Sequence, residues 1–382
     1  MAEIPFNRSP LLGREKAYVE DAIGRRRLSG DGFYTKLVSE HLKQRLGAAE
    51  VYLTHSCTAA LEMAALLIDL GPGDEVIMPS FTFTSTANAI ALRGAKPVFA
   101  DVSIGSMNID LDEIEALVTP ATKAILVVHY AGRVPDMDRV NEFARKRGLV
   151  VIEDAAQSYG SHYKGSPAGT HSALSTISFH DTKNVTAGEG GALVINDPRF
   201  IERAAVLREK GTNRQQFIQG QTDKYTWIDL GSSYLPSELI AAFLLGQLEC
   251  SDQITDARRD HWKRYREGFE RLMNRFRLGL PDQETADQPV NGHIFHILLR
   301  DARHRPVFLE EMKARGVNCT FHYVPLHSAP AGIRFGVAPR GCPVTEDAAA
   351  RLVRLPLFYE LTPQDIDYIL SQATSVLGSL EN

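Results

Sequence analysis

The chain has few cysteines, and they lie far apart. Cys57, Cys250, Cys319 and Cys342 are the four cysteines of its 382 residues, and no two of them form a CxxC pair. This spacing fits neither a zinc site nor a disulfide framework. We therefore expect no metal centre, and we expect reduced thiols of the kind found in the cytoplasm.

Long apolar segments and basic clusters are also missing. No stretch approaches the ~18 uninterrupted apolar residues of a membrane span, and residues 1–7 do not begin a signal peptide. Basic and acidic residues, 42 and 47 in number, are spread along the chain, and Arg25, Arg26 and Arg27 form its densest basic cluster. A solvated helix end explains that cluster best. We expect a cytoplasmic protein with no membrane segment and no nucleic-acid partner.

Hydrophobic residues are abundant enough, at 44%, for a large core. Short apolar runs at 75–78, 97–100, 124–128 and 149–152 alternate with helical patterns. Continuous hydrophobicity is typical of strands buried on both faces, so these runs predict a largely parallel sheet covered by helices, which is an α/β fold.

Two further apolar runs, 175–179 and 192–195, lie too close together for a helical crossover. We expect them to pair as a hairpin. Beyond residue 249 a long amphipathic helix is predicted, with Trp262, Tyr265 and Phe269 on one face. The length suggests about two domains, which we place at 1–250 and 251–382, the second being a smaller α/β domain.

Lys183 follows the first strand of the expected hairpin and precedes a glycine-rich segment, residues 187–191. A lysine normally has a pKa near ~10.4 and is inert as a nucleophile at neutral pH unless it is desolvated or engaged as a Schiff base. The ordinary explanation of a single lysine is a surface charge. The residues at the neighbouring strand ends decide between the two readings.

Asp154 ends the apolar run at 149–152, where an α/β sheet binds its ligands. A carboxylate at this position is able to keep the nitrogen of a pyridine ring protonated, although a helix-capping role explains it equally well. Gln157 follows on the same side of the next turn. Cys57 and Thr58 begin a predicted helix and fit a phosphate, or else a plain helix cap. Phe83 offers an aromatic face or a core side chain.

An anion-binding helix start, an aromatic side chain, a strand-end aspartate and a lysine together describe a site for pyridoxal phosphate (PLP). Here the chain resembles the nucleotide-sugar aminotransferases of the aspartate-aminotransferase fold, which are PLP enzymes of fold type I. The resemblance covers nearly the whole chain. The similar segments are 30–32, 56–61, 71–77, 79–83, 129–132, 153–157, 178–180, 182–184, 188–191, 322–327 and 355–358.

The resemblance implies a role for each candidate residue of the cofactor site. Lys183 would form the Schiff base, Asp154 would contact the ring nitrogen and Gln157 the ring hydroxyl. Phe83 would stack on the ring, and Cys57, Thr58 and Ser178 would surround the phosphate. The resemblance also implies a homodimer with active sites at the subunit interface. Many relatives place an Asn at the position of Ser233, and that Asn reaches the phosphate held by the neighbouring subunit; the shorter Ser233 is a departure from this pattern.

Segments 209–214 and 223–235 are similar to those of the family members that aminate carbon 4 of dTDP-4-dehydro-6-deoxy-D-glucose. This similarity implies transfer of nitrogen from L-glutamate to that dTDP-ketosugar, giving dTDP-4-amino-4,6-dideoxy-D-galactose. Another nucleotide-linked 3- or 4-ketosugar is the alternative. The related sugar 3-dehydratases carry His in place of the Schiff-base lysine, and a non-catalytic binding module would most simply have lost Lys183 or Asp154.

Several polar residues are candidates for contacts with the substrate, although structural roles explain single histidines and surface ion pairs as well. The candidates are His129, Asn213, Arg214, Tyr225 and His322.

Overall fold

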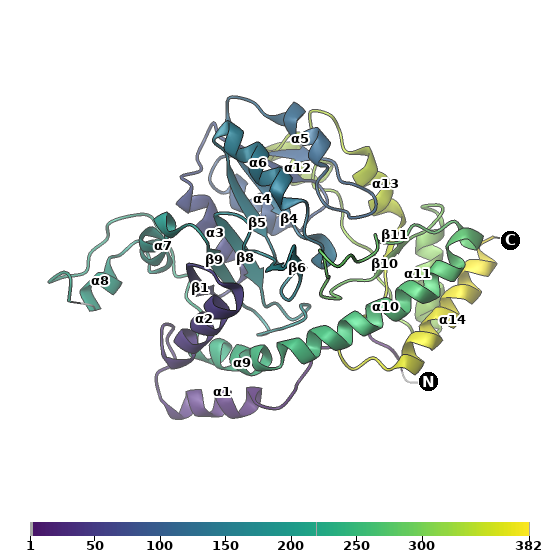
Figure 1. Cartoon of the computed structure of the whole chain (residues 1–382), viewed down its shortest axis with the longest axis horizontal. Helices are drawn as coiled ribbons and strands as arrows, with labels where there is room; N and C mark the ends of the chain where they lie inside the picture. The colour runs from purple at the N-terminus through teal and green to yellow at the C-terminus, as the bar shows by residue number, and fades with distance from the viewer. Residues whose placement is uncertain (1–2, 219, 382) are drawn as a thin grey trace.

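The computed structural model describes residues 3–218 and 220–381, and within them a seven-stranded sheet forms the centre of the larger domain (Figure 1). Its order is β1-β9-β8-β5-β4-β2-β3, and β9 runs antiparallel to both of its neighbours while the remaining pairs are parallel. The strands are β1 (Glu50–Thr54), β2 (Glu75–Pro79), β3 (Lys96–Ala100), β4 (Thr122–Val128), β5 (Val150–Asp154), β8 (Leu174–Ser178) and β9 (Gly191–Ile195).

The α/β prediction is confirmed, and so is the hairpin-like pair, which is β8 and β9. The four predicted parallel strands are β2 to β5. The sequence reading missed β1, because its buried residues Val51 and Leu53 alternate with the half-buried Glu50 and Tyr52 instead of forming a continuous apolar run. Alternation of this kind is typical of a strand with one better-covered face.

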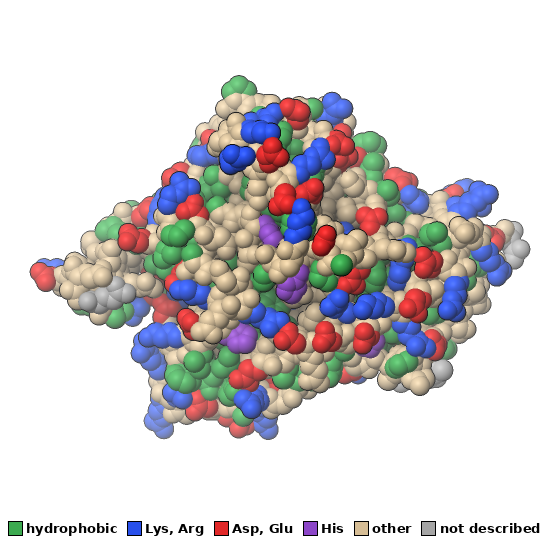
Figure 2. All heavy atoms as spheres, in the orientation of Figure 1, with side chains coloured by type: hydrophobic (Ala, Val, Ile, Leu, Met, Phe, Trp, Pro, Cys, Tyr) green, Lys and Arg blue, Asp and Glu red, His purple; other side chains and the backbone are tan. Residues whose placement is uncertain are grey.

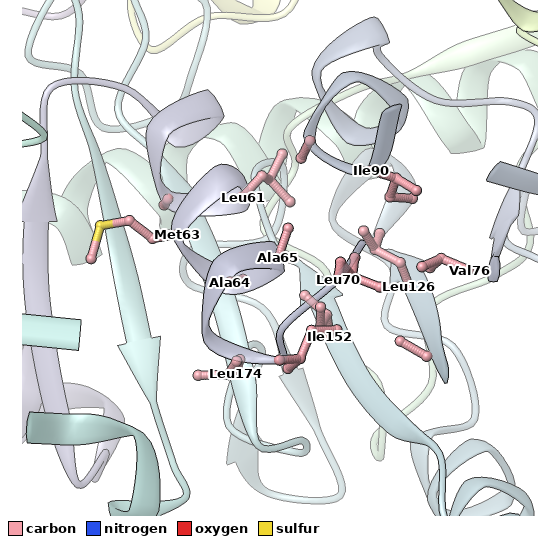
Figure 3. Packing of buried hydrophobic residues seen from close by; sticks show 14 of the residues in the cluster. Leu61, Met63, Ala64, Ala65, Leu70, Val76, Ile90, Leu126, Ile152 and Leu174 are labelled. Carbon is pink, nitrogen blue, oxygen red and sulfur yellow. The ribbon is translucent and has the colours of Figure 1, made fainter. Parts of the chain in front are cut away.

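Helices cover both faces of the sheet. On one face α3 (Cys57–Leu67) packs its small and branched side chains onto Leu126 of β4 and Ile152 of β5 (Figure 3). On the other face α5 (Leu111–Leu117) and α6 (Met137–Arg147) pack onto Val127 and Val151. Successive residues of a strand point to opposite faces, so Asp154 lies on the face of Ile152, and Glu153 on the face of Val151.

The remaining elements of the larger domain surround this core. The helices α1 (Glu15–Gly24), α2 (Phe33–Leu46) and α9 (Glu238–Glu249) pack together beside β1 and β9. A further segment carries α8 (Arg214–Ile218), which projects away from the body of the chain at the left of Figure 1. The other elements are α4 (Thr84–Ala91), α7 (Ile201–Arg208), and the short strands β6 (His162–Tyr163) and β7 (Ser166–Pro167).

A second core belongs to the C-terminal part of the chain. The long helix α10 (Ser251–Phe276) buries Trp262, Tyr265 and Phe269 in it, as the sequence predicted. We place the domain boundary at the break between α9 and α10, and Ile4 of the N-terminal segment joins the second core. The other elements are α11 (His304–Ala314), α12 (Pro330–Phe335), α13 (Pro343–Arg351), α14 (Pro363–Ser379), β10 (His296–Leu298) and β11 (Leu352–Arg354).

Charged side chains of both signs are interspersed on the face seen in Figure 2. The Arg25–Arg27 cluster lies at the exposed end of α1, as predicted. Among the residues that the structure describes, no helix is both long enough and apolar enough to cross a membrane.

Candidate functional site

A cavity of about 620 Å³ opens where the sheet's strands end. Its lining includes Val128 of β4, Asp154 of β5 and Ser178 of β8, together with residues that follow β1 and β2. The carboxyl ends of parallel strands meet at one edge of a sheet, which explains how residues far apart in sequence share this space. The C-terminal domain closes the cavity with the segment containing His322 and with the end of β11.

Lys183 lies half-buried in the lining of this cavity. Its backbone N–H donates to the carbonyl of His180 (2.9 Å), which fixes the turn that follows β8. Burial lowers the pKa of the Lys183 ammonium, and the nearby charge of Arg354 acts in the same direction, while Cys57 and Asp154 oppose both. A lowered pKa increases the share of free amine at neutral pH, and the free amine is the nucleophilic form.

Asp154 is 5% exposed and faces the same cavity. Its Oδ2 accepts a hydrogen bond from the Thr86 hydroxyl (2.8 Å), and its Oδ1 accepts one from the Ala156 amide (3.2 Å). Burial raises the pKa of this carboxyl above its usual range even though both hydrogen bonds and the charge of Lys183 work against that rise. A buried carboxylate in this state is stabilised by a cationic partner, which a protonated ring nitrogen supplies.

The first turns of α3 and α4 form one end of the cavity. Ser56 caps α3 by accepting from the Ala59 amide (3.1 Å), and the Thr58 and Ser85 hydroxyls lie 2.7 Å apart between the two helix starts. A Cβ at Gly191 would lie 2.4 Å from the Cys57 amide nitrogen, so glycine allows β9 to pass close to this helix start. Hydroxyls and positive helix ends are the donors that a phosphate prefers.

Cys57 begins α3 as a buried thiol in the same lining. Burial raises its pKa to about 12, with the charge of Asp154 adding to the effect. The side chain is therefore a neutral thiol at pH 7, and its contribution to the phosphate end is its backbone amide and its size. Ser178 also lines the cavity, and its Oγ accepts from the His180 amide (3.3 Å).

Phe83 and Gln157 also line the cavity. Phe83 is 58% exposed, whereas Phe81, two residues earlier, is fully buried in the core between the domains. The carboxamide of Gln157 is held at both ends: its Oε1 accepts from the Ala131 amide (2.7 Å), and its Nε2 donates to the Tyr323 hydroxyl (2.8 Å). An aromatic face that stays accessible inside a cavity fits a flat ring.

The candidates for substrate contacts divide into two groups. His322 lines the cavity, with its Nδ1 3.1 Å from the Tyr130 hydroxyl, and burial lowers its pKa well below the usual range. His129 is fully buried outside the lining, with Nδ1 3.0 Å from the Ser158 hydroxyl and Nε2 3.2 Å from Glu153, so its place in this structure is that of a core residue.

Asn213, Arg214 and Tyr225 lie on the projecting segment and not in this cavity's lining. Asn213 Oδ1 accepts from the Thr226 amide (2.7 Å), and Arg214 forms an ion pair with Glu209 (2.8 Å). Tyr225 is 56% exposed and packs on Phe217. These residues do not meet Lys183 within one copy of the chain.

Several lining residues escaped the sequence reading. Thr86 fixes Asp154 from α4, and Tyr323 fixes Gln157 from the C-terminal domain. Arg354 immediately precedes a segment that carries the family resemblance, and His293 lies in a loop that no motif marks. The hydroxyl-rich start of α4 was a usable signal for Thr86. Arg354 and His293 lie in the lining because the C-terminal part of the chain packs over the edge of the sheet, which the sequence does not indicate.

Three features of the lining fit PLP. The buried carboxylate of Asp154 forms no ion pair among the described residues, two helix starts present hydroxyls that suit a phosphate, and Lys183, whose pKa is lowered, shares the cavity with both. When bound, PLP supplies an electron sink for carbanions formed next to nitrogen.

Comparison with known proteins agrees with this geometry. Residues 12–374 match the DegT/DnrJ/EryC1/StrS aminotransferase family. A dTDP-4-dehydro-2,3,6-trideoxy-D-glucose 4-aminotransferase from Saccharopolyspora spinosa is 31% identical over 94% of this chain and 92% of its own length. GDP-perosamine synthase from Escherichia coli O157:H7 is 30% identical over 97% of each chain.

The solved structures of similar proteins include a PLP form. The putative sugar aminotransferase Spr1654 from Streptococcus pneumoniae, in that form, superposes with a TM-score of 0.90 at 26% identity and covers 99% of both chains. The family match spans nearly the whole sequence, and it includes every cavity residue named above. The chain belongs to the DegT/DnrJ/EryC1/StrS aminotransferase family and is a PLP-dependent aminotransferase.

Proposed function

We propose that the protein transfers the amino group of L-glutamate to carbon 4 of dTDP-4-dehydro-6-deoxy-D-glucose and so produces dTDP-4-amino-4,6-dideoxy-D-galactose. The observation that carries the proposal is the meeting of Lys183 and Asp154 in one cavity at the edge of the sheet. The names of two relatives, a dTDP-sugar 4-aminotransferase and GDP-perosamine synthase, support a nucleotide-linked sugar as the acceptor.

The proposed roles follow from the contacts of each side chain. Lys183 would hold the cofactor as a Schiff base, and its free amine would serve as the proton donor and acceptor at the donor's Cα. Asp154, oriented by the hydrogen bond from Thr86, would keep the ring nitrogen protonated. Phe83 would hold the ring through its aromatic face, and Gln157, which donates to the Tyr323 hydroxyl, would contact the ring hydroxyl.

The backbone amides of Cys57 and Thr58 at the start of α3 would hold the phosphate, together with the hydroxyls of Thr58, Ser85 and Ser178. Binding of the phosphate does not require a positively charged side chain here, because the N-terminal end of a helix carries partial positive charge.

We also propose that the active form is a cytoplasmic homodimer in which the projecting segment of one copy reaches the cavity of the other. Six exposed apolar side chains on this segment support the proposal, because water-exposed apolar surface on an extended arm is stabilised by a partner. They are Phe217, Ile218, Tyr225, Trp227, Ile228 and Leu230. The arrangement would bring Asn213, Arg214 and Tyr225 to the partner's substrate and leave Ser233 as a short side chain near its phosphate.

The test is to incubate the purified protein with PLP, L-glutamate and dTDP-4-dehydro-6-deoxy-D-glucose and to locate the new nitrogen by mass spectrometry and NMR. We expect nitrogen on carbon 4 with the galacto configuration. Parallel reactions with a GDP-linked 4-ketosugar and a dTDP-linked 3-ketosugar test the nucleotide and the ring position. Turnover of either alternative in place of the expected substrate would contradict the substrate assignment and leave the cofactor assignment intact.

A further inference from the structure

Residues 3–10 form an extended segment, which we call the strap, that crosses from the C-terminal domain to the larger domain. At its start, the Ile4 side chain is buried in the C-terminal core, and the Ile4 amide donates to the Gly316 carbonyl (2.8 Å). At its end, the Pro10 carbonyl accepts from Nε2 of Gln247 on α9 (2.8 Å). Figure 1 places the N-terminus next to α14 and α1 next to α9, and the strap connects these two regions.

Two prolines favour this extended course. Pro5 and Pro10 fix their own φ angles, and each disfavours helical backbone in the residue before it, which is Ile4 or Ser9. Among the described residues, 3–14 accordingly contain no helix. A chain already restricted by proline loses less conformational entropy when it is held in one course across two domains.

Two side chains of the strap contact the C-terminal domain. Phe6 shares the cavity lining with Lys183, and its ring centroid lies 4.7 Å from the guanidinium carbon of Arg354. The guanidinium carbon of Arg8 lies 5.4 Å from the centroid of the Phe358 ring. Contacts between a cation and an aromatic face are attractive, so they hold the middle of the strap against this domain.

The alternate side chains, Asn7 and Ser9, contact Asp181 of the larger domain instead. Nδ2 of Asn7 donates to the Asp181 carbonyl (3.2 Å). The Ser9 hydroxyl lies 3.3 Å from the same carbonyl and also bonds to the Asp181 carboxylate. Asp181 lies two residues before Lys183, so the strap binds the turn that carries the candidate Schiff-base lysine.

The other side of this turn has a separate anchor. Asn184, directly after Lys183, is buried, and its Nδ2 donates to the Asn291 carbonyl (2.8 Å) while its Oδ1 lies 2.9 Å from Nδ1 of His293. Asp181, before Lys183, is exposed, and the strap bonds to its carbonyl and its carboxylate. The lysine is therefore held from both sides, by the protein interior on one and by the strap on the other.

We propose that the strap positions the Lys183 turn relative to the C-terminal domain, with Asn7 and Ser9 as positioning residues that act through Asp181. The inference rests on the proposed role of Lys183. Because successive residues of the strap contact the C-terminal domain and the turn in alternation, a shift of that domain is transmitted to the turn. A reacting amine that is displaced by a fraction of an ångström loses rate even when its substrate is still bound.

The first test follows the turn itself in the cofactor-free protein by hydrogen–deuterium exchange. The double variant Asn7→Ala/Ser9→Ala removes the side-chain hydrogen bonds to Asp181 and leaves the strap's backbone contacts with both domains. We expect the amides of residues 181–188 to exchange about 5-fold faster, because this turn opens more often. Exchange in β8 and β9 should stay at the wild-type rate.

Two control variants accompany this measurement. Ser9→Thr keeps the hydroxyl, so exchange in residues 181–188 should stay within about 2-fold of wild type. Ser379→Ala removes a hydrogen bond from a serine hydroxyl to the Val376 carbonyl (2.7 Å) in α14, away from the strap. It should leave both the exchange of the turn and the turnover of the enzyme unchanged.

The second test measures the half-reaction with L-glutamate in the PLP-loaded protein, followed by the near-visible absorbance of the lysine-bound cofactor. In Asn7→Ala/Ser9→Ala the rate constant at saturating glutamate should fall about 10-fold, whereas the KM should change less than about 3-fold. The reason is that the contacts with the donor remain while the orientation of the Lys183 amine is lost.

The third test examines the transmission between the domains. Ile4→Ala weakens the docking of the strap on the C-terminal core, and we expect exchange in residues 181–188 to rise about 3-fold. In the Asn7→Ala/Ser9→Ala background the same substitution should have no further effect on the turn, because both changes act through one connection. A full, additive effect in that background would contradict the transmission through Asn7 and Ser9.

Two results would overturn the proposal as a whole. One is wild-type exchange and a wild-type rate constant in Asn7→Ala/Ser9→Ala. The other is faster exchange spread over the entire chain with a lower Tm, since this is the result that a merely structural tether predicts. The role of Lys183 fails separately: if another lysine carries the cofactor, that role is refuted, and the exchange measurement still decides whether the strap fixes the turn.

Discussion

Two buried carboxylates on consecutive residues of β5 face opposite sides of the sheet. Glu153 is fully buried on the side of α6, where its oxygens accept from the amides of Gly169, His171 and Ser172 and from the Ser172 hydroxyl. Asp154 lies on the side of α3 and accepts from Thr86 and Ala156 at the edge of an open cavity.

The pKa values of the two groups shift in opposite directions. Burial acts to raise the pKa of Glu153, but hydrogen bonds and charge from His129, His171 and Ser172 outweigh it, and the net shift is downward. Burial wins at Asp154, and its pKa is raised. The protein's own groups therefore outweigh the cost of burying the Glu153 carboxylate, whereas at Asp154 they offset that cost only in part. Position on the chain does not distinguish them, since the two residues are neighbours.

The largest effect should come from the lysine that shares the cavity with Asp154. Lys183→Ala removes both the attachment point and the proton carrier, and we expect amino transfer to fall about 10,000-fold. The absorbance of the lysine-bound cofactor in the near-visible region should disappear as well. A variant with full turnover would show that the cavity-facing side of the sheet does not carry the chemistry.

Asp154→Asn should separate activity from stability. We expect kcat to fall about 100- to 1,000-fold, because the ring nitrogen loses the charge that keeps it protonated. The free energy of unfolding of the cofactor-free protein should stay within about 1 kcal/mol of wild type, since the lost charge was unfavourably buried. Steady-state kinetics and denaturant unfolding measure the two quantities, and a large loss of stability would contradict the contrast with Glu153.

Glu153→Gln should show the reverse pattern. The amide nitrogen of Gln would face backbone donors that Glu153 now accepts from, so we expect a loss of about 3 kcal/mol in the free energy of unfolding. The kcat of the folded, PLP-loaded variant should stay within about 3-fold of wild type, because Glu153 lies outside the cavity lining. A kcat loss comparable to that of Asp154→Asn would refute the division of roles between the two faces.

A smaller effect is expected from His296, a buried group with neither a polar partner nor a cavity. Both ring nitrogens lack a hydrogen-bond partner among the described residues, and burial lowers its pKa to about 3. The unfolded state thus binds more protons between pH 6.5 and about 3, so stability is lost as the pH falls through that window.

In His296→Phe this proton linkage is removed. Between pH 7 and pH 5 the variant should lose about 2 kcal/mol less of its free energy of unfolding than the wild type does. Urea unfolding at the two pH values measures the difference, and an unchanged slope would show that His296 is not neutral in the folded protein. The result would also show that an unpartnered buried group need not belong to the active site.

The sequence predicted what depends on local patterns. The continuous apolar runs of β2 to β5 predicted a buried parallel sheet, and the short spacing between 175–179 and 192–195 predicted the pairing of β8 with β9. Lys183, Asp154, Cys57, Thr58 and Phe83 lie at a strand end or a few residues after one, so the rule that ligands bind at strand ends predicted that they share one site. β1 was not predicted, because its buried and half-buried residues alternate and form no continuous apolar run.

Contacts between residues that lie far apart along the chain could not be predicted from the sequence. His129 follows β4 just as Asp154 ends β5, yet it lies on the Glu153 side of the sheet, and the strand's register rather than its sequence position decides the face. Arg354 and Tyr323 reach the cavity because two domains meet, and no periodicity in either domain encodes that meeting. The projecting segment carries Asn213, Arg214 and Tyr225 away from their own cavity, which a linear reading could not foresee.

The most direct test of the cavity's role is covalent. Borohydride reduction of the PLP-loaded protein makes a bond between a lysine and the cofactor permanent, and peptide mapping by mass spectrometry then identifies the lysine. We predict a pyridoxyl group on the peptide that contains Lys183. In Asp154→Asn the same peptide should be labelled, and the labelled fraction should fall only as far as the bound cofactor does. A label on any other lysine would contradict the assignment of the active site.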